Sequence, residues 1–156
     1  MATPEFVTSL RAKIGHDPLW LPGVTAVTFD DAGRVLLCRR ADSGRWALIT
    51  GILDPGEEPA PGALRELEEE TGVVAEVEHM IHAGSHGPIT FPNGDVCRFL
   101  NLAFRCRPVS GQARVNDDES LEVAWFAVDA LPELSDRHRM LIDLAVRADG
   151  VPAFTR

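Results

Sequence analysis

The apolar residues nearest the N-terminus follow the spacing of an amphipathic helix. Val7, Leu10 and Ile14 recur at helical intervals, Pro4 suits a first helical turn, and Gly15 ends the run. Pro is tolerated in a first turn because its missing N–H group would have no helical partner there. The pattern therefore predicts a short helix between Pro4 and Gly15.

A second apolar segment, residues 16–22, follows this helix and contains Leu and Trp side chains. We divide the chain into an N-terminal leader, residues 1–21, and a main domain, residues 22–156. The leader carries more apolar surface than a free tail exposes, and contiguous apolar patches usually mark a contact. The leader must pack on its own domain or on a second copy of the chain, and we favour a homodimer.

Runs rich in β-branched and other apolar residues predict strands in the middle of the chain. The runs 24–29 and 34–39 are joined by Asp30-Asp31-Ala32-Gly33, a sequence typical of a hairpin turn. We expect these two strands to pair antiparallel. Further strands are predicted at 46–49, 75–83, 96–107 and 121–128, with a turn-rich loop over residues 84–95.

The last periodic stretch predicts a helix that covers the sheet. It begins after Ser135, a suitable N-cap, and carries Leu141 and Leu144 at helical spacing. It is expected to end near Ala148, just before Gly150, because glycine commonly stops helices.

Residues 51–73, GILDPGEEPAPGALRELEEETGV, combine a glycine-bounded loop with an acidic helix. At about 100° per residue, Glu66, Glu69 and Glu70 fall on one face of this helix. Like charges at these spacings repel one another, so the cluster weakens the helix unless a cation lies against it. Oxygen ligands suit Mg²⁺ or Mn²⁺ better than zinc. A solvated acidic face is the alternative, and Glu68, which points away from the other three, fits it.

The same stretch resembles the Nudix box at each of its fixed positions. Gly51 is followed after five residues by Glu57, and after seven more by the run Arg65-Glu66-Leu67-Glu68-Glu69-Glu70-Thr71-Gly72-Val73. On these residues the chain is similar to the Nudix (MutT-type) hydrolases. The resemblance implies an α/β/α sandwich around a mixed β-sheet, to which the N-terminal helix would be an addition.

The resemblance also implies roles for individual residues. Glu66, Glu69 and Glu70 would ligate Mg²⁺ (or Mn²⁺), the Gly51 carbonyl would face the metal, and Glu66 and Glu69 would take part in catalysis. The residues that would support the loop and helix are Glu57, Arg65 and Gly72.

Two positions depart from the common pattern of that family. Many members have Leu-Pro-Gly-Gly before the box, whereas this chain has Leu48-Ile49-Thr50-Gly51, which predicts a stiffer loop. Gly62 stands where alanine is favoured, and glycine costs about 1 kcal/mol relative to alanine inside a helix. Pro59 and Pro61 place the start of this helix at Glu58 or Pro59.

Further candidates lie outside the box. Nudix enzymes often carry an additional acidic residue, as metal ligand or general base, in the loop that corresponds to Asp117-Asp118-Glu119. We choose Glu119, with a solvated acidic turn as the alternative. Arg39, Arg40 and Arg45 lie near the entrance to the box and are candidates for substrate phosphate, and His86 is a candidate for contact with substrate. For these four residues simple exposure to solvent is the alternative.

The composition fits one globular domain and excludes some partners. The chain has 156 residues, of which 25% are charged, and a net charge of −9. This charge argues against binding duplex nucleic acid or an anionic membrane surface. Cys38, Cys97 and Cys106 lack the spacing of a metal site and, with no signal peptide, fit reduced thiols packed in the core of a cytoplasmic protein.

The resemblance implies divalent-metal-dependent hydrolysis of the pyrophosphate linkage between a nucleoside diphosphate and another group, X. Nudix ADP-ribose pyrophosphatases tend to carry a proline about fifteen residues after the box, where this chain has Pro88. A nucleoside triphosphate is the other substrate considered, while the dinucleoside-polyphosphate subgroup favours a tyrosine, which this chain lacks. The alternative function is a non-catalytic nucleotide-binding or sensor module, although such domains typically lose box glutamates that are all present here.

Overall fold

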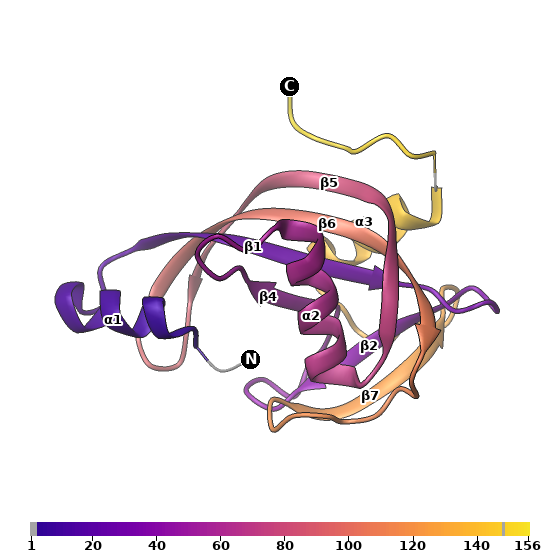
Figure 1. Cartoon of the computed structure of the whole chain (residues 1–156), viewed down its shortest axis with the longest axis horizontal. Coiled ribbons are helices and arrows are strands. Elements are labelled where there is room, and N and C mark those ends of the chain that lie inside the picture. Colours follow the sequence, from indigo (N-terminus) through magenta and orange to yellow (C-terminus); the bar gives the residue numbers. More distant parts are fainter. Residues whose placement is uncertain (1–2, 148) are drawn as a thin grey trace.

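The computed structural model describes residues 3–147 and 149–156 and places strands between two helical layers (Figure 1). The helices are α1 (Glu5–Ile14), α2 (Pro59–Thr71) and α3 (Asp136–Arg147); the strands are β1 (Leu19–Thr28), β2 (Arg34–Arg40), β3 (Trp46–Ala47), β4 (Ile49–Ile52), β5 (Val74–Thr90), β6 (Val96–Ser110) and β7 (Ser120–Ala127). The predicted α/β/α sandwich with an additional N-terminal helix is confirmed. Residues 1 and 2 of the predicted leader, and Ala148 at the predicted end of the last helix, lie outside the described residues.

The strands form two sheets that share the same core. The first is mixed, in the order β4-β1-β6-β5, because β1 pairs antiparallel with β4 and parallel with β6. The second, β3-β2-β7, is antiparallel. The predicted single strand 46–49 is therefore two short strands in different sheets, and the buried Leu48 lies where the chain passes between them.

Successive residues of the inner strands face opposite helices, as the period of a strand requires. On β2, Leu36 and Cys38 pack in the apolar cluster beneath α2, whereas Val35 and Leu37 pack in the cluster beneath α3. Both faces are buried, which explains why these strands read as continuous apolar runs. The three cysteines are free and buried, as predicted. No described helix has the length and apolar character needed to cross a membrane.

The predicted antiparallel pairing of residues 24–29 with 34–39 is wrong. The turn itself forms, since the Asp30 carboxylate accepts hydrogen bonds from the backbone N–H groups of Ala32 and Arg34. Yet only one isolated bridge, between Phe29 and Val35, joins the two strands. Both edges of β1 are already hydrogen-bonded to β4 and β6, so β2 diverges and pairs with β7 in the second sheet.

The predicted loop over residues 84–95 is also wrong for most of its length. Strand β5 continues to Thr90, and only the tip of a long hairpin with β6 remains a turn, closed by the Phe91 N–H group donating to the Asp95 carbonyl. Pairing with β6 outweighs the weak strand propensity of the glycines and proline here. The register shifts between His86 and Ile89, as expected where a bulge absorbs an unfavourable residue.

The leader packs on its own domain, which is the alternative that the sequence left open. Val7 of α1 and Leu21 of β1 are buried with Cys97 and Phe99 in one apolar cluster. Arg11 also fastens α1 to the β5–β6 hairpin: it donates to the Val96 carbonyl at 3.0 Å and to the Cys97 sulfur at 3.3 Å. Most of the apolar surface of the leader that was predicted to contact a second copy of the chain is therefore covered by the chain itself.

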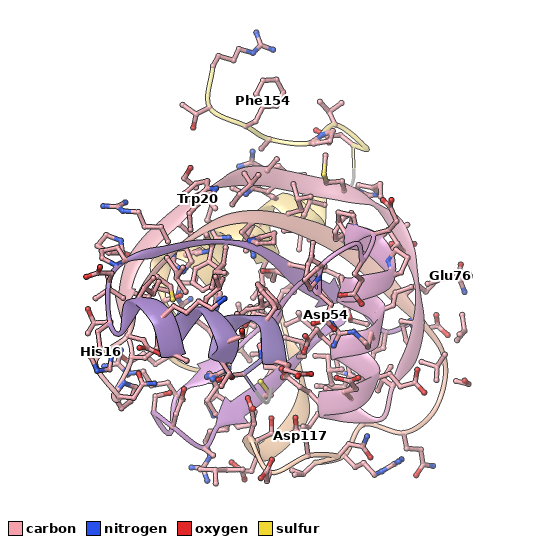
Figure 2. All side chains as sticks on the ribbon, turned by 60° about the vertical axis from the view of Figure 1, so that its left-hand side comes forward. His16, Trp20, Asp54, Glu76, Asp117 and Phe154 are labelled. Carbon is pink, nitrogen blue, oxygen red and sulfur yellow. The ribbon has the colours of Figure 1, made fainter. Side chains whose placement is uncertain are left out.

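The end of the leader is continuous with the sheet. Strand β1 begins at Leu19, so the predicted boundary after residue 21 falls inside this strand. Among residues 3–21, Leu10 and Trp20 are the large apolar side chains that stay exposed, and Trp20 is 58% exposed at the surface (Figure 2). The homodimer stays a prediction that now depends on these two side chains.

Candidate active site

Helix α2 carries two of its carboxylates into the protein. Glu66 and Glu70 are 1% and 2% exposed. The side chain of Glu69 is 57% exposed, and Glu68 faces solvent, as predicted. The predicted acidic face is thus a pair of buried carboxylates with Glu69 beside it at the surface. The helix starts at Pro59, as predicted, and ends at Thr71; the next residue, Gly72, caps it in the left-handed conformation that favours glycine.

Arg65 connects the loop before α2 to the carboxylates on the helix. Its Nε and Nη2 donate to the two oxygens of Glu57 at 2.7 and 2.9 Å, and its Nη1 donates to Glu66 at 3.0 Å and to Glu69 at 3.2 Å. The hydrogen bonds from Arg65 hold the pKa of Glu57 below its ordinary value. Such bidentate, charge-assisted bonds fix geometry as well as charge. Arg65 therefore fastens the loop to the helix and offsets part of the carboxylate repulsion.

Two glycines allow the loop and strand to approach α2. A Cβ on Gly51 would collide with the Glu66 carboxylate, and a Cβ on Gly62 would collide with Leu53 and crowd Glu57. This close approach explains why glycine replaces alanine at position 62. The loss of helix propensity there is offset by packing of the loop directly on the helix.

The two buried carboxylates have properties that fit a divalent cation. Burial raises the pKa of Glu66 to about 7, against the lowering effect of Arg65, and burial also raises the pKa of Glu70 to about 7. Oε2 of Glu66 and Oε1 of Glu70 are buried and lack a hydrogen-bond partner among the described residues. Unpaired carboxylate oxygens are costly to bury, and a hard cation that prefers oxygen ligands would compensate them.

The three predicted metal-binding glutamates do not converge on one point. No group of three acidic, histidine or cysteine side chains within residues 3–147 and 149–156 has the arrangement of a preformed metal site. Glu66 and Glu70 lie on the buried side of α2, whereas Glu69 is held at the surface by Arg65. Gly51 is in contact with Glu66, which is where the predicted backbone ligand would be needed.

A cleft of about 920 Å³ includes Gly51 in its lining. It extends from the N-terminal segment across β4, β1 and the β5–β6 hairpin to the start of α3. One part of the cleft is lined by apolar side chains, and another part is lined by charged and polar side chains. Residues that line it include Val7, Leu21, Phe91, Phe99, Asn101, Arg40, Asp42, Asp118, Glu119, His86, Arg137 and His138.

The acidic loop is held against the C-terminal end of α2, where Figure 2 shows Asp117. The amide nitrogen of Asn116 donates to the backbone carbonyls of Glu68 and Glu69 at 3.2 and 3.0 Å. The Asp117 carboxylate accepts a hydrogen bond from the backbone N–H group of Glu119. These contacts place Glu119 in the lining of the cleft.

Two of the three arginines that are candidates for substrate phosphate lie outside the cleft. Arg39 forms an ion pair with Glu122 across β2 and β7 at 2.8 Å, and Arg45 is exposed; neither belongs to the described lining of the cleft. Arg40, the third of these candidates, lines the cleft and is paired with Asp42. Neighbouring residues of a strand face opposite sides, so Arg39 and Arg40 cannot both face the cleft.

Helix α3 contributes to the cleft, which its sequence pattern did not predict. Arg137 and His138 lie in its first turn and line the cleft together with Asn101 of β6. His86, predicted as a loop residue, lines the same cleft from β5 and lies against Phe99. The sequence signal for the role of α3 was the pair Arg137-His138 at the start of a helix that was predicted only to cover the sheet.

Comparison with known proteins shows the family to which the chain belongs. A sequence model described as the NUDIX domain matches residues 19–144. A MutT-like protein of Streptomyces ambofaciens is 36% identical over 85% of this chain and 76% of its own length. The human 8-oxo-dGDP phosphatase NUDT18 is 30% identical over 80% of this chain, which spans 38% of that protein. The crystal structure of a MutT NUDIX hydrolase from Burkholderia pseudomallei, 30% identical, superposes with a TM-score of 0.65 over 81% of this chain and 98% of that one.

The fold, the box helix and these matches define the class, and the chain belongs to the Nudix family. It is an enzyme that hydrolyses pyrophosphate linkages in nucleotide derivatives. The alternative of a non-catalytic sensor module is therefore set aside.

Proposed function

We propose that Glu66, Glu70 and the Gly51 carbonyl hold a Mg²⁺ or Mn²⁺ ion with which this chain hydrolyses a nucleoside diphosphate linked to a further group. The observation that carries the proposal is that Glu66 and Glu70 each bury a carboxylate oxygen that has no hydrogen-bond partner among the described residues. When bound, a divalent ion neutralises phosphate charge and lowers the pKa of a coordinated water molecule. Glu69 remains a proposed ligand and catalytic group, and it would have to leave Arg65 to reach the ion.

The chain's own groups supply the remaining chemistry. Glu119 lines the cleft and is proposed as the general base that accepts the proton of the attacking water. Arg65 and Glu57 keep the loop and helix in place, so that Gly51 stays against Glu66. The net charge of −9 repels a polyphosphate, which makes the cations in the cleft necessary for binding.

The substrate is proposed at the level of a class. The human relative is named for 8-oxo-dGDP, which supports a nucleoside diphosphate, and a nucleoside triphosphate remains the other substrate considered. Pro88, which resembled a marker of ADP-ribose pyrophosphatases, is exposed and stands outside the described lining of the cleft. ADP-ribose nevertheless shares the same pyrophosphate linkage and belongs in the test.

The experiment is a substrate panel with a matched pair of variants. Phosphate-bearing products are measured from nucleoside diphosphates, nucleoside triphosphates and ADP-ribose, with Mg²⁺, with Mn²⁺ and in excess chelator. We expect metal-dependent turnover that Glu70→Gln lowers and Glu68→Gln, an exposed change of the same kind, leaves intact. Full activity in chelator would refute the metal proposal, and equal activity of the two variants would refute the role of Glu70.

A further inference from the structure

Arg137 is a partly buried guanidinium without a carboxylate partner. Within the part of the chain that the structure describes, its one hydrogen bond joins Nη2 to Oδ1 of Asn101 at 2.7 Å, and no acidic side chain pairs with it. Burial lowers the pKa of Arg137 below its ordinary value. A cation taken partly out of water without a counter-ion is destabilising. The position therefore favours an anionic ligand.

Two buried polar residues, Asn101 and Thr25, hold the Arg137 guanidinium in place. Asn101 is 6% exposed and Thr25 is 1% exposed. The Asn101 side-chain oxygen accepts hydrogen bonds from the Thr25 hydroxyl at 3.1 Å and from Arg137. A carbonyl oxygen has two lone pairs, so both are used. Asn101 consequently fixes the orientation of Arg137, whose Nε and Nη1 donors remain available.

The neighbouring side chain offers a second unsatisfied group. Nδ1 of His138 is buried and has no hydrogen-bond partner among the described residues. Burial, aided by the charge of Arg137, lowers the pKa of His138 to about 4, so its imidazole is neutral near pH 7. Arg137, His138 and Asn101 line the same cleft as Gly51 and Glu119. The three form a polar site on the α3 side of the cleft, which we call the Arg137 site.

We propose that the Arg137 site binds a phosphate group of the nucleotide, with Arg137 donating to its oxygens and Asn101 acting as the positioning residue. The proposal rests on the proposed function for the class of substrate. A planar guanidinium with two free donors matches the oxygens of a phosphate. The described lining of the cleft includes Arg137 but none of the α2 carboxylates, so the site would add a second anchor for the substrate and set its orientation in the cleft.

The test measures binding by calorimetry in excess chelator, without turnover. The ligands are AMP, adenosine and ribose 5-phosphate, which separate the phosphate from the base. Arg137→Gln should weaken AMP and ribose 5-phosphate by about tenfold or more, the effect of losing a charge-assisted hydrogen bond, and leave adenosine unchanged. If the variant weakens AMP and adenosine alike, the site contacts the base and the proposal is wrong. It is also wrong if no ligand is affected, or if the wild-type chain binds AMP no better than adenosine.

Three further variants control for folding and charge. Arg139→Gln removes the same charge from the same helix at an exposed position, where Arg139 donates to the Pro132 carbonyl, and it should bind all ligands as wild type does. Arg137→Lys should retain part of the affinity for AMP. Asn101→Asp keeps the acceptor for Arg137 but adds a negative charge, so it should weaken AMP while adenosine binding is retained.

The proposed metal-dependent hydrolysis and the Arg137 site can be refuted independently of each other. Binding in chelator does not depend on the metal or on chemistry, so loss of the Arg137 effect leaves metal-dependent hydrolysis standing. A chain that binds AMP through Arg137 but hydrolyses nothing would overturn the proposed function and leave the Arg137 site standing.

Discussion

Gly51 and Glu66 pack so closely that a methyl group on residue 51 would occupy the space of the Glu66 carboxylate. Gly51→Ala should displace this side chain, weaken Mg²⁺ binding and destabilise the fold by about 1 to 3 kcal/mol, the usual cost of overpacking. Calorimetry and urea unfolding measure the two effects. Gly33→Ala is the control: residue 33 has a positive φ and open space around it, so it should lose stability and keep its metal affinity. Unchanged metal affinity in Gly51→Ala would contradict the proposed site.

Glu70→Gln keeps the shape of the side chain and removes the charge proposed to hold the metal. We expect Mg²⁺ affinity to fall at least about tenfold, since losing an anionic interaction with a cation costs more than the 1.4 kcal/mol that corresponds to that factor. The fold should survive, because a neutral group suits this buried position better than a carboxylate. Calorimetry on the folded variant measures the affinity, with Glu68→Gln as the control. Undiminished affinity would remove Glu70 from the metal site.

Glu119→Gln tests the general base. Its kcat should fall by roughly 10²- to 10⁴-fold, the usual range for this role, while substrate affinity changes little. Steady-state kinetics at saturating metal measures both quantities. Glu122→Gln, on the exposed face of β7 where it pairs with Arg39, should retain activity. A decrease in kcat of less than about threefold would mean that Glu119 belongs to a solvated acidic turn and that another residue is the general base.

His138 should make stability depend on pH. Its pKa is lowered to about 4 by burial, whereas an unfolded histidine titrates near 6.5. The unfolded chain therefore binds the additional proton first as pH falls, so the His138 contribution to stability is complete above about pH 6.5 and declines towards pH 4. Glu66 and Glu70, whose pKa values are raised to about 7, contribute the opposite slope. The full effect of His138 is on the order of 3 kcal/mol.

Urea unfolding between pH 4.5 and 7.5 checks this dependence. The free energy of unfolding of the wild type minus that of His138→Gln should fall as pH is lowered below about 6.5, because the contributions of Glu66 and Glu70 cancel in this difference. His16→Gln serves as the control because the side chain of His16 is 66% exposed. This variant should show the same dependence of stability on pH as the wild type. Parallel curves for wild type and His138→Gln would show that the imidazole is not buried in its neutral form.

The acidic helix could be predicted from the sequence because its features are local. The intervals between Glu66, Glu69 and Glu70 set their angles around the helix, and Pro59 and Gly72 mark its ends through their own backbone preferences. The contacts of Arg65 with Glu57 and Glu69 also span few residues. What the spacing could not show is that Glu66 and Glu70 are buried while Glu69 stays in solvent, since that depends on how β4 lies against the helix.

The cleft was decided by the tertiary structure. Arg40 rather than Arg39 lines it because pairing with β7 sets which face of β2 each side chain takes. Residues 84–90 became a strand because β6 offered hydrogen bonds that their local preferences did not indicate. Arg137 meets Asn101 from 36 positions away in the chain. A helix repeats its geometry every few residues and can be read locally, whereas strand pairing joins distant segments whose register no single segment contains.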